Sequence, residues 1–117
     1  MDDDRIGAFE RDLWVGGEDV YRERVSRDVQ MVLPQEPYVF SGKDAIRAVT
    51  NTPRWSEVDL SGLQVSRPEE GLIVIAYEAR ASRGDEHYRA FCTSTYLRRG
   101  HEDWEVVQHQ QTLGLTH

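Results

Sequence analysis

Apolar residues recur at helical spacing near the start of the chain. Ile6, Phe9 and Leu13 lie three or four positions apart, three aspartates precede them and a glycine pair follows them. Because acidic side chains favour the start of a helix and glycine favours its end, this pattern predicts a helix over residues 3–15. Apolar residues at mixed helical offsets then predict a short second helix over residues 18–25.

The next segment alternates apolar and polar residues, which predicts a first strand over residues 28–33. The strand is expected to end where Pro34 lacks a backbone N–H. Ser41 and Asp44 are spaced like the two members of a helix capping box, and an apolar stripe follows them. A third helix is therefore predicted over residues 43–50.

From residue 58 onward the chain has the pattern of strands. Strand-like apolar positions run to residue 65 and end at a predicted turn over residues 67–71. Three long strands separated by segments of hairpin length are predicted over residues 72–82, 88–99 and 104–113.

Helices at the front of the chain and an antiparallel meander behind them predict an α+β fold. We expect three N-terminal helices packed on a curved, mainly antiparallel sheet, with residues 1–117 forming one domain. A curved sheet with helices across its mouth encloses a pocket.

Charge and composition narrow the choice of partners. The chain has 21 acidic and 14 basic side chains, a formal net charge of −7, which repels phosphate backbones and anionic lipid headgroups. No apolar stretch approaches the roughly 20 residues of a membrane-spanning helix. We therefore expect neither nucleic acid nor a membrane as a partner. The start of the chain lacks the pattern of a secretory signal and Cys92 has no second cysteine to pair with, so a cytoplasmic location is expected.

The last predicted strand carries polar side chains where a core strand would carry aliphatic ones. It reads Trp104-Glu105-Val106-Val107-Gln108-His109-Gln110-Gln111-Thr112. A buried amide or imidazole without a hydrogen bond costs about 1–3 kcal/mol. These side chains must therefore face a wet cavity, a partner subunit or an internal hydrogen-bond network.

Strict alternation divides this strand into two faces. His109 and Gln111 share one face with Val107, and we assign this face to the pocket. The other face, assigned to a partner sheet, carries Trp104, Val106, Gln108 and Gln110. A β-bulge within the strand would reverse the assignment.

His109 is the candidate for acid–base chemistry because it is the histidine that the pattern places within a strand. An imidazole that titrates near neutrality can accept and return a proton. The alternative is a core or interface histidine that is hydrogen-bonded to a neighbouring hydroxyl. Aromatic rings with polar tips commonly wall small-molecule sites, and the expected ligand contacts combine such rings with polar strand residues. The expected contacts are Tyr38, Trp55, Tyr77, Ser94 and Gln111.

Other chemistry receives less support from the sequence. Glu78 and Arg80 share a strand face, as a surface ion pair or as a carboxylate base beside a guanidinium in a pocket. The sequence contains no metal-ligand spacing, no glycine-rich phosphate loop and no nucleophile elbow, so we expect neither a metal nor a cofactor.

The order of elements, helix-helix-strand-helix and then four strands, resembles the nuclear transport factor 2-like superfamily, also described as the ketosteroid-isomerase-like or SnoaL-like cone fold. The specific part lies in segments 76–81, 93–99 and the last strand, which resemble a bacterial branch of mostly unassigned function. The resemblance implies a homodimer formed through the sheet and a small hydrophobic or polar-aromatic ligand in the cone. It transfers no catalytic residue. Glu78-x-Arg80 lacks the second aspartate of the superfamily's epoxide hydrolases, and the first helix carries Trp14 rather than the tyrosine of ketosteroid isomerases.

Three functions remain open at this point. The first is a small-molecule-binding cone domain of unassigned activity, and the second is a cofactor-independent isomerase, cyclase or hydratase-like enzyme that uses His109 as acid and base. The third is a structural or assembly module without a ligand. An enzyme requires His109 to reach a cavity and to have an orienting partner, whereas an assembly module would leave the cone filled with side chains.

Overall fold

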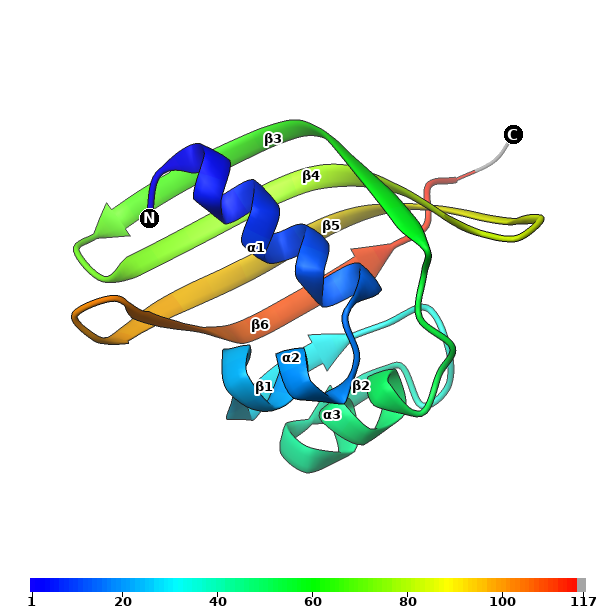
Figure 1. The fold of residues 1–117 in the computed structure, drawn as a ribbon, viewed down its shortest axis with the longest axis horizontal. Coiled ribbons are helices and arrows are strands. Elements are labelled where there is room, and N and C mark those ends of the chain that lie inside the picture. Colours follow the sequence, from blue (N-terminus) through cyan, green and yellow to red (C-terminus); the bar gives the residue numbers. More distant parts are fainter. Residues whose placement is uncertain (116–117) are drawn as a thin grey trace.

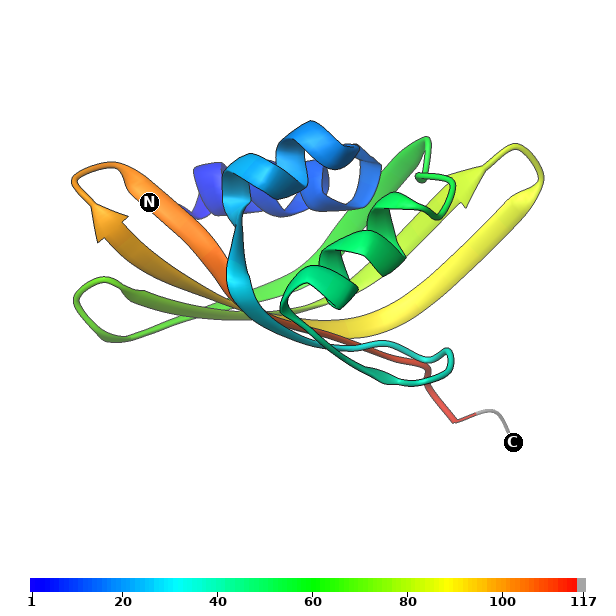
Figure 2. The same ribbon diagram turned by 90° about the horizontal axis from the view of Figure 1, so that it is seen from below.

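Three helices cover one face of a curved six-stranded sheet in the computed structural model, which describes residues 1–115 (Figure 1). Seen from below in Figure 2, the sheet bends around the helices and its opposite face is left uncovered. In chain order the elements are α1 (Asp3–Val15), α2 (Glu18–Arg24), β1 (Val25–Val32), β2 (Val39–Ser41), α3 (Gly42–Thr50), β3 (Glu57–Glu69), β4 (Leu72–Arg83), β5 (Glu86–Gly100) and β6 (Asp103–Thr112). The predicted α+β class is confirmed, although two strands come before the third helix.

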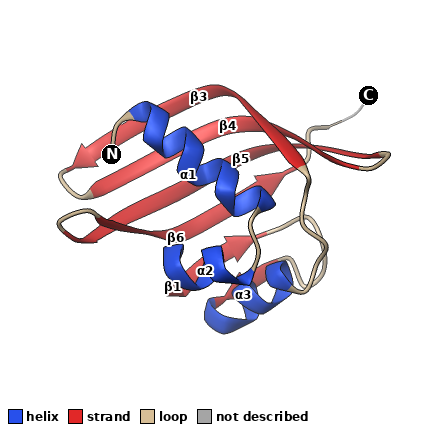
Figure 3. Ribbon diagram, in the orientation of Figure 1, coloured by secondary structure: helices blue, strands red, loops and turns tan. Residues whose placement is uncertain are grey.

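The strands lie side by side in the order β2-β1-β6-β5-β4-β3 (Figure 3). Strands β3 to β6 form an antiparallel meander, and β1 joins it in parallel beside β6, with Met31 opposite His109. The sheet is therefore mainly antiparallel, as predicted. Because β6 has a neighbour on both sides, His109 lies in the interior of the sheet.

Helix α1 forms where the sequence predicts it. The side chain of Asp2 accepts a hydrogen bond from the backbone N–H of Arg5 at 2.8 Å, which caps the helix start. Ile6, Leu13 and Trp14 are buried on the side of the helix that faces the sheet. The helix crosses the concave face diagonally (Figure 1).

The boundaries of the elements around α3 differ from the prediction. Ser41 does not cap the helix, because its hydroxyl donates instead to the side-chain oxygen of Gln30 on β1, at 3.1 Å. It belongs to β2, a strand that the sequence analysis missed because three residues are too few to show alternation. Strand β1 also begins at Val25, earlier than predicted.

The predicted turn at residues 67–71 is wrong in its first half. Strand β3 continues through Pro68 to Glu69, and the chain turns at Glu70 and Gly71, where φ of Gly71 is +81°. Proline is tolerated there because β3 is an edge strand with one hydrogen-bonded neighbour.

A β-bulge interrupts β6, so strict alternation fails along this strand. Thr95 pairs with Gln108 but Tyr96 pairs with Val106, which leaves Val107 as the extra residue. Val106 is consequently buried on the same face as His109. The predicted sharing of a face by Trp104 and Val106 with Gln108 and Gln110 is therefore wrong.

Within residues 1–115, no helix is long and apolar enough to cross a membrane.

The junction between α1 and α2 provides a test of packing. A Cβ atom on Gly16 would lie 2.5 Å from the Asp12 carbonyl oxygen and 2.6 Å from a methyl group of Val20, whereas a Cβ atom on Gly17 would meet nothing within 4 Å. We expect Gly16→Ala to lower the free energy of unfolding by about 1–3 kcal/mol through overpacking. Gly17→Ala should change it by less than about 0.5 kcal/mol. Urea titration of both variants measures the difference, and equal effects would show that the packing described at this junction is incorrect.

Candidate functional site

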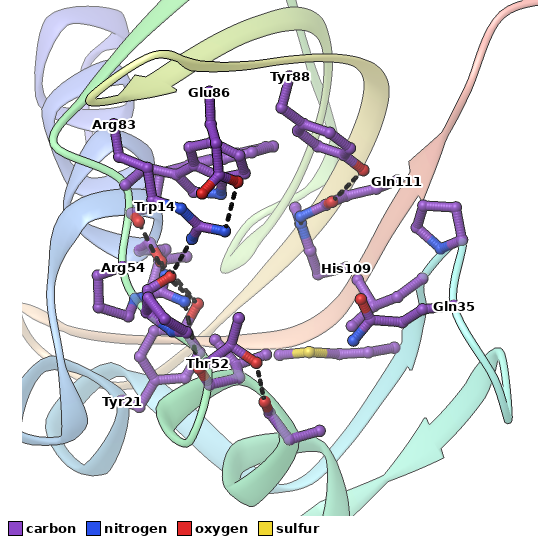
Figure 4. Close-up of a pocket in the computed structure, with 18 of the residues that line it drawn as sticks. Trp14, Tyr21, Gln35, Thr52, Arg54, Arg83, Glu86, Tyr88, His109 and Gln111 are labelled. Atoms are coloured by element: carbon purple, nitrogen blue, oxygen red, sulfur yellow. Dashed lines mark hydrogen bonds and ion pairs between the residues drawn. The ribbon is translucent and has the colours of Figure 1, made fainter.

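A cavity of about 370 Å³ lies at the wide end of the cone (Figure 4). Its walls come from the end of α1, from α2 and α3, from the loop that follows α3, and from the concave face of the sheet. The wall combines apolar side chains, among them Leu13, Met31, Val49 and Val106, with polar ones. The volume is within the range of small-molecule sites, which is roughly 300–1,000 Å³.

Stacked flat groups form the side of the cavity nearest the β4–β5 hairpin. The rings of Trp55 and Tyr88 are parallel within 16°, with centroids 5.4 Å apart. The guanidinium of Arg83 lies 4.2 Å from the centre of the Trp55 ring and pairs with Glu86 at 3.0 Å. The charge of Arg83 is therefore neutralised within the hairpin.

Arg54 ties the loop after α3 to the end of α1. Its guanidinium donates to the backbone carbonyls of Leu13 and Trp14 and, at 2.7 Å, to that of Gly16. A cation at these carbonyls complements the negative end of the helix dipole. Arg54 thus connects two parts of the cavity wall, the loop after α3 and the end of α1.

Beneath the cavity, the sheet-facing side of α1 carries a completely buried carboxylate. Glu10 is 0% exposed, and three hydroxyl groups donate to its two oxygens, those of Tyr77, Ser94 and Tyr96. Burial and the nearby carboxylate raise the pKa of both tyrosines well above the ordinary value of 10.0, so both hydroxyls remain donors. Trp14 completes the cluster by donating its indole N–H to the Tyr77 oxygen at 2.9 Å. The carboxylate therefore has the hydrogen bonds that a buried acceptor requires.

Ser94 connects this carboxylate to the candidate histidine. Its oxygen lies 2.6 Å from Glu10 and 2.7 Å from Nδ1 of His109. Because the single hydroxyl proton goes to the carboxylate, Nδ1 must carry a proton and donate it to Ser94.

The other side of the imidazole leads to the same assignment. Nε2 of His109 lies 3.1 Å from the amide nitrogen of Gln111, which can only donate, so Nε2 is the acceptor. The amide oxygen of Gln111 accepts in turn from the Tyr88 hydroxyl at 2.8 Å. The donors thus run in one direction, from Tyr88 through Gln111, His109 and Ser94 to Glu10, and we call these five side chains the relay.

Burial keeps the imidazole neutral. It lowers the pKa of His109 below the ordinary value of 6.5, and the attraction of Glu10, whose carboxylate lies 3.6 Å from Nδ1, offsets this only in part. A neutral ring with a proton on Nδ1 agrees with both contacts of the relay.

The structure distributes the expected site residues over three places. His109, Trp55 and Gln111 line the cavity. Tyr77 and Ser94 lie beneath it, hydrogen-bonded to Glu10. Tyr38 is 51% exposed in the loop between β1 and β2 and is not among the lining residues.

Glu78 and Arg80 lie on the uncovered face of the sheet. Their side chains pair at 2.7 Å, and Arg89 joins Glu78 at 3.0 Å. This is the surface ion pair among the two alternatives, and the pair takes no part in the cavity.

Glu10 is the member of this hydrogen-bond network that the sequence analysis missed. It stands four residues after Ile6 and three before Leu13, so it occupies the apolar stripe of α1. A carboxylate on a buried stripe needs partners, and that position was the available signal.

Solved structures of the same architecture come from nuclear transport factor 2-like proteins. A Parabacteroides distasonis protein provisionally named a ketosteroid isomerase aligns with a TM-score of 0.79 at 17% identity, over 93% of this chain and 85% of its own. A protein of unknown function from Prochlorococcus marinus aligns with a TM-score of 0.72 at 10% identity, over 100% and 97%. The association domain of C. elegans CaMKII aligns with a TM-score of 0.74 at 11% identity, over 94% and 91%.

No protein-family model matches the sequence, and no curated protein sequence matches it significantly. The structural neighbours confirm the predicted resemblance at the level of architecture. The chain has the nuclear transport factor 2-like fold, and identities this low carry no ligand or reaction over to it.

The lowered pKa of His109 predicts a loss of stability in acid. The unfolded chain binds a proton at the ordinary pKa and the folded chain only at lower pH, so the free energy of unfolding falls as the pH drops below 6.5. The slope from this one group is at most about 1.4 kcal/mol per pH unit. Urea titrations at pH 7.5 and pH 5.5 should show a smaller loss for His109→Gln than for the wild type, and a wild-type loss for His101→Gln at an exposed site. An unchanged loss in His109→Gln would mean that the imidazole is not held neutral.

Proposed function

We propose that this protein binds a neutral, largely apolar small molecule in the cavity at the wide end of the cone. The observation that carries the proposal is the open cavity itself, whose wall combines apolar side chains with polar groups that include His109, Gln111 and Tyr88. A module that served assembly alone would need no such space.

The charges around the cavity support a neutral ligand. Arg83 is paired with Glu86, and Arg54 donates to backbone carbonyls. An anionic ligand would have to displace these contacts, and a cationic one would lie close to two arginines. An uncharged molecule requires neither change.

Filling the cavity tests the proposal. N-phenyl-1-naphthylamine, a neutral apolar dye, should bind the wild type with increased fluorescence. Val49→Trp places an indole in the cavity and should weaken binding by at least about tenfold, equivalent to roughly 1.4 kcal/mol. Val39→Trp adds the same ring at a position that is 63% exposed and outside the cavity, and should bind like the wild type. Equal dye binding by all three proteins would place the dye elsewhere and refute the proposed site.

A second candidate function is proton transfer, and the tautomer of His109 favours it. Nε2 is an unprotonated base at the cavity wall, and Ser94 orients the ring from the other side. In a cofactor-independent isomerase, cyclase or hydratase-like reaction, Nε2 would take a proton from the substrate and return it at another atom. The Gln111 amide would donate to an oxygen that gains negative charge. Exchange of the carbon-bound hydrogens of 2-tetralone in deuterium oxide, faster with protein than in buffer, distinguishes a catalyst from a binding protein.

The proposal includes a homodimer formed through the uncovered face of the sheet. This face presents a shallow hollow in which Phe91 is 42% exposed. It also carries Glu78 together with Arg80 and Arg89, so two copies related by a twofold axis could pair charges of opposite sign.

Sedimentation velocity tests the dimer. The wild type should have twice the mass of one chain, and Phe91→Asp should shift it toward the monomer by placing like charges at the interface. Ala8→Asp, on the exposed side of α1, serves as the control and should sediment like the wild type. A monomeric wild type would refute this part of the proposal but not the proposed binding of a ligand in the cavity.

A further inference from the structure

We infer that the cavity selects ligands whose polar end donates a hydrogen bond, such as the hydroxyl of a flat phenol, alcohol or enol, and that Nε2 of His109 accepts it. The inference rests on the proposed function, because it names the class of ligand for that same cavity. Three observations carry it: the direction of the relay, the position of the Gln111 amide and the flat groups of the wall.

The direction of the relay fixes what the imidazole offers to the cavity. Ser94 donates its one hydroxyl proton to Glu10, so Nδ1 of His109 donates to Ser94. A neutral ring with its proton on Nδ1 has a lone pair on Nε2. Toward the cavity, His109 is therefore an acceptor, and the buried carboxylate at the other end of the relay maintains this polarity.

The Gln111 amide occupies the position of a ligand donor. Its nitrogen lies 3.1 Å from Nε2, and Gln111 itself lines the cavity. A ligand hydroxyl can displace the amide from Nε2. The hydroxyl then donates its own hydrogen to Nε2 in place of the amide N–H. The released amide still has two N–H groups, so it can donate to the oxygen of the same hydroxyl. A hydroxyl satisfies both side chains at once.

An ether or ketone of the same shape cannot do this. It has no hydrogen for Nε2. It can leave Gln111 in place and accept from the second N–H of that amide, which is one hydrogen bond where a hydroxyl makes two, or it can displace the amide and leave the buried Nε2 without a donor. A buried acceptor without a donor costs about 1–3 kcal/mol. The difference in affinity between the two kinds of ligand therefore arises at a single atom, Nε2 of His109.

The walls favour a flat frame for the hydroxyl. Trp55 and Tyr88 stack within 16° of parallel, and the rings of Trp14 and His109 are nearly perpendicular with centroids 6.3 Å apart. Aromatic rings stack on such surfaces or meet their edges favourably. A flat ring that carries a hydroxyl can contact these groups while it reaches Nε2.

A matched pair of probes tests the inference. 2-Naphthol and 2-methoxynaphthalene share a ring system and are both neutral at pH 7, and only the first has an O–H donor. Calorimetric titration of the wild type should show 2-naphthol binding about tenfold more tightly. His109→Phe keeps a ring without the acceptor and should bind both probes alike. His101→Phe, at an exposed position outside the cavity, should keep the preference.

The wild type alone supplies a second measurement that does not depend on any variant folding. Two-bond ¹H–¹⁵N correlation spectra should show the proton of His109 on Nδ1, and 2-naphthol should shift the Nε2 resonance while 2-methoxynaphthalene leaves it in place. A proton on Nε2 in the free protein would overturn the inference.

The outcomes separate this inference from the proposed function. Equal affinity of the wild type for both probes overturns the donor preference and leaves the binding cavity intact. Binding of N-phenyl-1-naphthylamine without binding of either naphthalene probe would also overturn the donor preference and leave the binding cavity intact. If none of the three compounds binds, the proposed function and the inference are both wrong.

Discussion

The structure depends on one buried carboxylate and the hydroxyls that surround it. Glu10 joins α1 to β4 through Tyr77 and to β5 through Ser94 and Tyr96. These bonds are directional, whereas the apolar contacts of the same helix are not. A shift of α1 by one residue would turn the carboxylate about 100° away from its three donors. Glu10 therefore sets the register of the helix on the sheet in a way that apolar packing alone could not.

The same constraint leaves room for the cavity. Trp14 lies one turn beyond Glu10 and also bonds to Tyr77, so the cluster extends toward the wide end of the cone. There Arg54 gathers the last carbonyls of α1 and holds the loop after α3 against them. The helix is fixed at both ends of this stretch and cannot settle deeper onto the sheet. The space between α1, α3 and the sheet remains open for that reason.

Most helices and strands of this arrangement could be predicted from the sequence, but the contacts between them could not. Helix α1 and the long strands were predictable because each has a periodic pattern of its own. The polar character of β6 was visible as well, and it correctly indicated that His109 and Gln111 need partners. The bulge at Val107 was not visible, because it arises from pairing with β5, and it placed Val106 on the face of His109. The partnership of Glu10 with Ser94 joins positions 84 residues apart, which no local pattern encodes.

The polarity of the relay links stability, protonation and binding. One lone pair, that of Nε2, serves as the acceptor for Gln111, as the site where a proton would add, and as the acceptor proposed for a ligand. Only one of these can occupy it at a time. Burial disfavours the proton because a charged imidazole loses its hydration, and a hydrogen bond from a neutral donor carries no such penalty. Burial of His109 therefore has two effects. It lowers the free energy of unfolding in acid, and at neutral pH it keeps the cavity-facing nitrogen unprotonated and able to accept from an uncharged donor. This explains why a histidine and a completely buried glutamate are placed in one network although they do not form a simple ion pair.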